Sequence, residues 1–246
     1  MSRTAIIVWK SIGVSVVAIL LIAAAVWGYM MSPITEPCRS IIYDIQDREA
    51  RMYLTEQELN QLLQTEDIYP VGRQQNRVSL HRIESAVQHH PMVRTAECYL
   101  TPRFDVHVQL TQRVPLVRVQ TEGGTYFIDT DRKVMPYRSA VQDQVLYVTG
   151  TVGPQLASTQ LADFALWLQS NKYWHKQISH VYVQSPHMIY LYTTTGSPRI
   201  LLGAMSGFEQ KLSKMRTFQE NSQDAVRDKH YTEYDIRFAG QVIGRN

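Results

Sequence analysis

Hydrophobic and polar positions alternate most strictly over residues 104–111, where Phe, Val, Val and Leu take every second place between polar side chains. A period of two is that of a strand with one buried face, so the segment predicts a half-buried antiparallel strand. Residues 39–47 alternate in the same way, and 93–100 is a third segment typical of a strand. With two intervening helices, these strands predict a compact β-α-α-β-β unit.

Both helices are expected between the first and second strands. Thr55 starts a capping box, because its hydroxyl can accept a hydrogen bond from the Glu58 amide while the Glu58 side chain reaches back. Leucines at positions 59, 62 and 63 then form one apolar helical face. Ser79 is a second N-cap residue, followed by apolar residues at 80, 83 and 87, and Pro91 ends that helix.

A second set of elements begins beyond Thr121. The pattern predicts a hairpin around 126–132, a helix over 161–168 and another from Phe208 to Met215. Further strands are expected at 145–148, 178–183, 188–193, 200–202 and 234–243. The sequence therefore predicts an α+β protein with a β-α-α-β-β unit at 38–121 and a mixed α/β unit with a mainly antiparallel sheet at 122–246.

The last predicted strand, from Tyr234 to Ile243, has a special position. A terminal strand often lies at a sheet edge, where unpaired backbone groups can accept another strand. The alternation alone is equally compatible with an interior strand that has no free edge.

An uninterrupted apolar run over residues 11–31 precedes both units. About 20 such residues suffice to cross a bilayer core of about 30 Å, so the run predicts a transmembrane helix. Arg3 and Lys10 lie before it and residues 1–10 contain no acid, which predicts a cytoplasmic tail and an exported body. A cleaved signal peptide is the alternative, because small residues at 23–25 could form a cleavage site.

Composition and chemistry narrow the function classes. A net charge of +3 without a Lys/Arg cluster argues against nucleic acid as a partner. No hydrolase, zinc-protease or phosphate-loop motif occurs, so we expect neither an enzyme nor a cofactor or metal site. The adjacent His89 and His90 suit a helix end, and Asp129 and Asp131 suit a tight turn.

The two cysteines leave a question open. Cys38 and Cys98 could form a disulfide in an oxidising compartment, or remain two small, partly buried hydrophobic side chains. Their spacing is compatible with both.

Three stretches of the chain resemble the FtsQ/DivIB family of bacterial cell division proteins. Residues 90–96 and 108–115 are similar to the end of its POTRA domain. The second stretch joins 126–129 to Met135-Pro136 and 148–150, and the third joins 200–203 and Lys211 to 234–238. Two positions depart from the family pattern: Gln112 replaces the usual Glu, and Arg132-Lys133 replaces a turn glycine.

The resemblance implies a non-catalytic, single-pass scaffold of the inner membrane at the division septum, with a periplasmic body. It implies that FtsB, held with FtsL, adds a strand to the edge of the FtsQ-type C-terminal β domain. FtsK and other division proteins would dock on the POTRA-like unit. Carried over to this sequence, the partner-binding residues are Tyr234, Asp235, Ile236, Arg237, Phe238, Ala239 and Gly240. In this expectation Arg237 pairs with an acid of the partner and Phe238 is an apolar anchor.

Other functions fit parts of the pattern. A POTRA-bearing protein of outer-membrane assembly or transport would need a tandem array, and no internal repeat is evident. A membrane-tethered hydrolase with a site built from scattered residues, and a membrane-tethered peptidoglycan-binding module, are both compatible with the composition.

Overall fold

The computed structural model describes residues 19–27, 36–46, 53–139, 141, 145–196, 198–221 and 231–246. Residues 19–27 are helical. Among the described residues, no helix has the length and apolar character needed to cross a membrane. The rest of the predicted span, 11–18 and 28–31, and the predicted tail at 1–10 lie outside the described residues.

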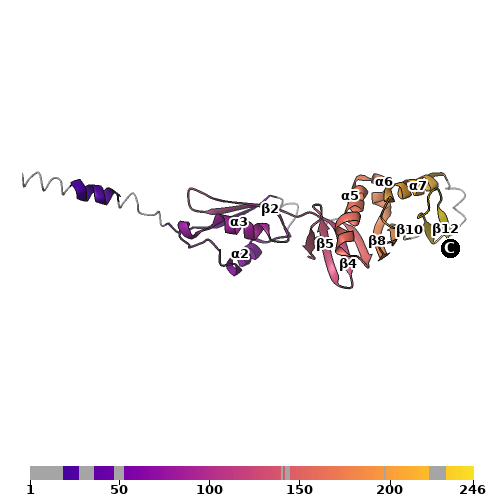
Figure 1. The fold of residues 1–246 in the computed structure, drawn as a ribbon, viewed down its shortest axis with the longest axis horizontal. Helices are drawn as coiled ribbons and strands as arrows, with labels where there is room; N and C mark the ends of the chain where they lie inside the picture. The colour runs from indigo at the N-terminus through magenta and orange to yellow at the C-terminus, as the bar shows by residue number, and fades with distance from the viewer. Residues whose placement is uncertain are drawn as a thin grey trace, which may run out of the picture.

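The first unit has the predicted β-α-α-β-β order (Figure 1). Its elements are β1 (Ile41–Ile45), α2 (Glu56–Thr65), the 3-10 turn η1 (Gln75–Arg77), α3 (Leu80–Gln88), β2 (Val93–Leu100) and β3 (Val106–Gln112). The three strands form one sheet in the order β1-β3-β2. β3 pairs antiparallel with β2 as predicted and parallel with β1.

Local sequence signals explain the two helices of this unit. The Thr55 hydroxyl accepts the Glu58 amide hydrogen bond at 3.2 Å, and the Ser79 hydroxyl accepts that of Arg82 at 3.4 Å, which confirms both N-caps. Glu58 does not complete the box, because its carboxylate binds Arg138 instead. Fully buried apolar side chains join both helices to the sheet, among them Leu59, Leu63, Ile83, Val87, Val106 and Val108.

Both cysteines are free thiols. The Cys38 thiol donates a hydrogen bond to the Ser40 carbonyl at 3.4 Å, and burial raises its pKa. Burial also raises the pKa of Cys98 to about 12. Both side chains therefore stay protonated at neutral pH and belong to the core of the first unit.

The second unit is built on one nine-stranded sheet in the order β12-β11-β10-β9-β8-β7-β4-β5-β6. Its strands are β4 (Pro115–Thr121), β5 (Gly124–Asp129), β6 (Val134–Pro136), β7 (Leu146–Gly150), β8 (Ile178–Ser185), β9 (Met188–Thr193), β10 (Arg199–Gly203), β11 (Glu233–Asp235) and β12 (Ile243–Arg245). Three neighbouring pairs are parallel, β4–β7, β7–β8 and β10–β11, and the other five are antiparallel.

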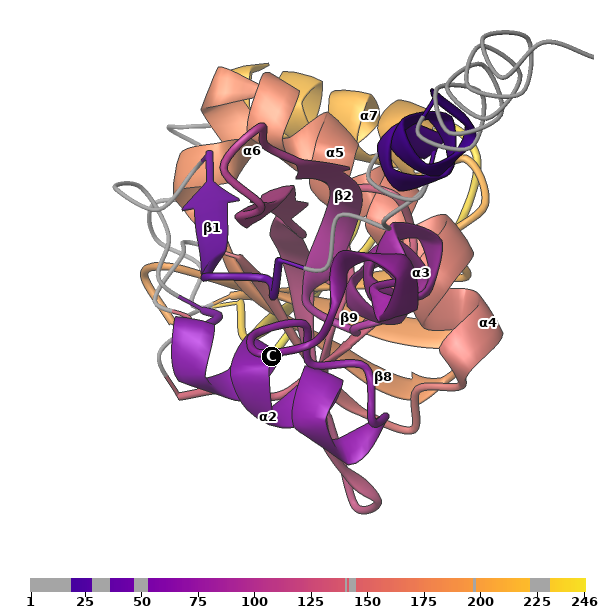
Figure 2. The ribbon, with the colours of Figure 1, turned by 90° about the vertical axis from the view of Figure 1, so that its left-hand side faces the viewer.

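Helices cover one face of this sheet (Figures 1 and 2). They are α4 (Pro154–Leu156), which continues through a π-helical turn (Ala157–Leu161) into α5 (Ala162–Ser170), then α6 (Lys172–Gln177) and α7 (Phe208–Asn221). Phe164 and Trp174 are the largest side chains buried beneath them, and both belong to the core formed with alternate residues of the central strands. The predicted helices in this half of the chain are confirmed.

The structure corrects the expected boundary between the units. β4 pairs with β5 and β7, so residues 115–121 belong to the nine-stranded sheet and the first unit ends at Gln112. Val117 and Val119 of β4 are buried in the core of the second unit.

A small apolar cluster and several polar contacts join the two units. The buried members of this cluster come from both units and are Tyr53, Met92, Phe127 and Met135. The Gln112 side-chain carbonyl accepts a hydrogen bond from the Tyr53 backbone amide at 3.0 Å. Gln112, which replaces the usual Glu of the family pattern, therefore has a hydrogen-bond partner within the chain.

Ion pairs at the same junction involve the turn aspartates. Arg94 binds Asp131 through two hydrogen bonds of 2.8 and 2.9 Å, and Arg113 binds the buried Asp129 at 2.7 Å. Asp129 also accepts the Lys133 amide hydrogen bond at 2.6 Å, as a turn aspartate does. Arg132 has a φ of 64° there, the conformation that a turn glycine adopts more readily.

Candidate functional site at the C-terminal hairpin

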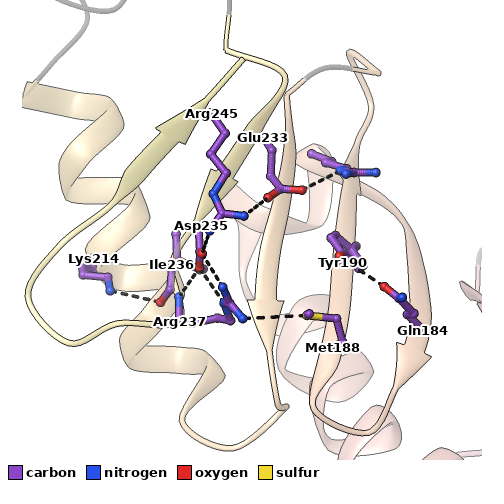
Figure 3. Close-up of polar contacts among 10 residues, drawn as sticks. Gln184, Met188, Tyr190, Lys214, Glu233, Asp235, Ile236, Arg237 and Arg245 are labelled. Atoms are coloured by element: carbon purple, nitrogen blue, oxygen red, sulfur yellow. Dashed lines mark hydrogen bonds and ion pairs between the residues drawn. The ribbon is translucent and has the colours of Figure 1, made fainter.

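The predicted partner-binding residues lie in a short hairpin at one end of the nine-stranded sheet (Figure 3). β11 pairs parallel with β10 and antiparallel with β12, with Glu233 opposite Arg245 and Asp235 opposite Ile243. β12 therefore has β11 on one side and, within the described residues, no strand on the other. This makes β12 the open edge of the sheet at this end.

Asp235 is the polar centre of the hairpin. Its side chain has no exposed surface, and it binds Arg237 through a fork of two hydrogen bonds, of 2.9 Å from Nε and 2.8 Å from a terminal nitrogen. Arg245 adds a third charged hydrogen bond at 2.7 Å. The Arg237 contact, more than any other, lowers the pKa of Asp235. A buried carboxylate held by two guanidinium groups fixes both arms of the hairpin.

Glu233 repeats this arrangement two residues earlier. It is 8% exposed and binds Arg199 of β10 at 2.9 Å and Arg245 of β12 at 3.3 Å. The Arg199 guanidinium also lies over the Tyr190 ring, 4.9 Å from its centroid. Arg245 thus contacts both buried acids of β11, and it is the side chain that ties the edge strand to the sheet.

Two lysines of α7 bind backbone carbonyls here, Lys214 in the segment that follows β11 and Lys211 at the end of β10. The Lys214 ammonium donates hydrogen bonds to the carbonyls of Ile236, at 3.1 Å, and Phe238. Lys211 donates to the carbonyls of Leu202 and Ala204, at 3.2 and 2.7 Å. Burial lowers the pKa of both ammonium groups, and the charge of Lys214 lowers that of Lys211 further.

A groove of about 540 Å³ lies between the start of α7 and this segment. Lys211, Lys214 and Arg237 line it with positive charge, and Phe238 lines it with an aromatic ring that is 45% exposed. Both lysines donate their hydrogen bonds to backbone carbonyls, and the nearby charge of Asp235 acts on Lys214. The groove suits an acidic segment with an apolar side chain.

The expected long strand from Tyr234 to Ile243 is wrong. β11 ends at Asp235, because the Arg237 amide donates to the Asp235 side chain at 3.2 Å, and the chain then reverses through Gly240, whose φ is 76°. Tyr234 and Ile236 are buried in the core.

The remaining predicted site residues divide into two groups. Arg237 is paired with Asp235 in the structure, and its pairing with an acid of the partner stays a prediction. Phe238, Ala239 and Gly240 are exposed and line the groove. Sequence reasoning missed Lys211, Lys214 and Arg245, which lie far along the chain or past the predicted edge and carry no local motif.

Candidate residues for other chemistry lie apart from this hairpin. Among the described residues, no group of three or more His, Cys, Asp and Glu side chains lies close enough to hold a metal ion. His89 is the C-cap of α3, with Nδ1 2.6 Å from the Ser85 carbonyl oxygen. His90 lies at the unit junction, 3.7 Å from Glu58, and burial lowers its pKa.

Comparison with known families divides the chain at the same place as the structure. A family model described as FtsQ/DivIB, C-terminal related, matches residues 114–245, which is more than half of the chain. A second model, described as POTRA-like domain, matches residues 36–111. No curated protein gives a significant match. The two matched regions meet where β3 passes into β4.

Proposed function

The chain belongs to the FtsQ/DivIB family, and on that premise we propose that it is a non-catalytic, membrane-anchored scaffold of the bacterial division machinery. Its C-terminal hairpin binds FtsB, which is held with FtsL, by accepting a strand. FtsK and other division proteins dock on the POTRA-like unit. In this proposal the chain works by positioning partners.

The observation that supports partner binding is the open edge of β12 beside the charged groove. Strand addition needs a backbone edge that stays in place, and Arg245 holds β12 to Glu233 and Asp235. The added strand pairs with Ile243–Arg245, which replaces the edge at Tyr234–Gly240 expected from the sequence.

The groove gives the partner its chemistry. An apolar side chain of the partner packs on the exposed Phe238 ring, and an acidic side chain approaches Lys211 and Lys214. The bound segment is therefore extended, with an acid and an apolar residue near the end that pairs with β12.

The apolar run 11–31 supports the membrane part of the proposal. Its length and the cations before it favour an inner-membrane span with the N-terminus in the cytoplasm and the body in the periplasm. At the septum, a shared membrane surface raises the effective concentration of single-span partners. Protease digestion of spheroplasts tests this topology: the body is digested from outside, and its protection would contradict the proposal.

The partner-binding experiment is capture of the FtsB/FtsL pair by the full-length chain in detergent. Phe238→Ala should weaken capture about tenfold, since truncation of an aromatic anchor costs more than about 1 kcal/mol. Tyr99→Ala is the matched control, because Tyr99 is 49% exposed in the other unit. Equal capture by the wild-type chain and Phe238→Ala would overturn the proposed site.

A further inference from the structure

β2 is a long strand at the edge of the three-stranded sheet, and its outer side is a second place in the molecule where another strand could pair. It is eight residues long and has β3 on one side and, within the described residues, no strand on the other. Such an edge presents a row of backbone N–H and C=O groups that can pair with another chain. Tyr99 on this strand is 49% exposed.

Side chains of α3 occupy the outward backbone groups of β2. The Gln88 amide donates to the Arg94 carbonyl at 2.9 Å and accepts from the Ala96 amide at 2.7 Å. The Glu84 carboxylate accepts from the Cys98 amide at 3.0 Å. These three bonds lie on the side of β2 away from β3, at alternate positions of the strand.

The Gln88 side chain reproduces the bonding of a strand residue. In a parallel pair, one residue donates its N–H to one carbonyl of its neighbour and accepts an N–H from two residues further on. The primary amide of Gln88 forms the same two bonds, to Arg94 and Ala96.

Helix and strand spacing allow Glu84 to continue the row. Residues four apart on a helix are about 6 Å apart along its axis, and alternate strand residues are about 6.6 Å apart, so the two repeats nearly match. α3 and β2 run in opposite directions, and Glu84 therefore reaches Cys98 while Gln88 reaches Ala96. Buried Ile83 and Val87 hold this face of the helix against the sheet core.

We propose that the Gln88 and Glu84 side chains form a plug that closes the β2 edge against strand pairing with a second copy of this chain. Two identical edges related by a two-fold axis can pair antiparallel, so an open β2 edge would make the chain self-associate. The β2 plug satisfies the same backbone groups from within the chain. This proposal does not depend on the partner proposed for the C-terminal hairpin.

The experiment removes the β2 plug from the full-length chain in detergent. In Gln88→Ala/Glu84→Ala, the Ala96 and Cys98 amides should exchange about fivefold to tenfold faster, the effect of losing about one net hydrogen bond at each site. The same variant should self-associate with increasing concentration in analytical ultracentrifugation, while the wild-type chain should not.

Two further variants keep the result interpretable. Gln61→Ala makes the same change on the exposed face of α2 and should leave both readouts unchanged. Gln88→Ala alone removes two of the three bonds, and it replaces the double variant if that variant does not fold. Unchanged amide exchange would overturn the proposal, and so would faster exchange in a chain that stays monomeric at every concentration.

Discussion

The two units of the molecule carry edge strands of opposite design. β2 is eight residues long, and its outward backbone groups are bound by Gln88 and Glu84 from a neighbouring helix. β12 is only three residues long; it pairs with β11 through the backbone, and its Arg245 side chain binds two buried acids on its inner side. One edge is therefore closed by side chains, and the other is fixed in place while no strand of the described residues lies on its outer side.

The difference indicates how a scaffold can direct a strand to one edge. A short edge is a weak template for non-specific pairing, and it gains specificity from the groove beside it. A long edge pairs more readily, so it needs protection. The predictions that follow change one edge and measure both.

Arg237→Glu should have the largest effect. The new carboxylate would face buried Asp235, and breaking a buried pair costs about 3–5 kcal/mol. We expect the exchange of amides over 231–246 to rise strongly while that of β2 does not change. Arg237→Lys is the control, since it keeps the charge but loses the fork, and it should have a smaller effect. Slow exchange over 231–246 in Arg237→Glu would contradict the assigned role of Asp235.

Arg245→Ala should have an intermediate effect on the same hairpin. Its guanidinium is 48% exposed, and loss of its hydrogen bonds to charged groups should cost about 1.5–3 kcal/mol locally. Partner capture should fall with it, because β12 then keeps only its backbone pairing with β11. Arg199→Ala removes a contact to the same Glu233 from the side of β10 and should leave capture unchanged. If capture falls equally in Arg245→Ala and Arg199→Ala, its loss does not report the fixation of β12 by Arg245.

The elements with strong local signals were predictable from the sequence. The alternation over 106–112 has buried residues at every second position, and the caps at Thr55 and Ser79 form as expected. In each case the decisive information lies within a few residues: a period of two, or a hydroxyl three residues before an amide.

The two edges were not predictable, because distant residues decide them. Asp235 and Ile236 are buried in succession, since Arg245 joins Arg237 in binding the carboxylate and the isoleucine packs in the core. No alternation can encode that pattern. Glu84 and Gln88 look like solvent-facing positions of an amphipathic helix, and only the packing of α3 against β2 gives them backbone partners.

Acid should open the C-terminal hairpin. Contacts with Arg237 lower the pKa of Asp235 in the folded chain, so its ionisation stabilises the hairpin fully above the unfolded pKa of about 3.9. That stability is lost as the pH falls below this value and through the lower folded pKa. Amide exchange over 231–246, corrected for its intrinsic pH dependence, should rise below about pH 4. The neutral Gln88 amide should keep the Ala96 amide protected over the same range, and early loss of that protection would contradict the contrast between the edges.

Gln88→Glu should have the smallest effect and should show which half of the amide closes the β2 edge. The carboxylate can still accept from the Ala96 amide but cannot donate to the Arg94 carbonyl. One net hydrogen bond is worth about 1 kcal/mol, and the like charge of Glu84 four residues earlier adds a few tenths. Exchange of the Ala96 amide should therefore stay closer to wild type than in Gln88→Ala, with Gln61→Glu on α2 as the matched control. If Gln88→Glu and Gln88→Ala expose this amide equally, acceptance by the side chain is not what protects it.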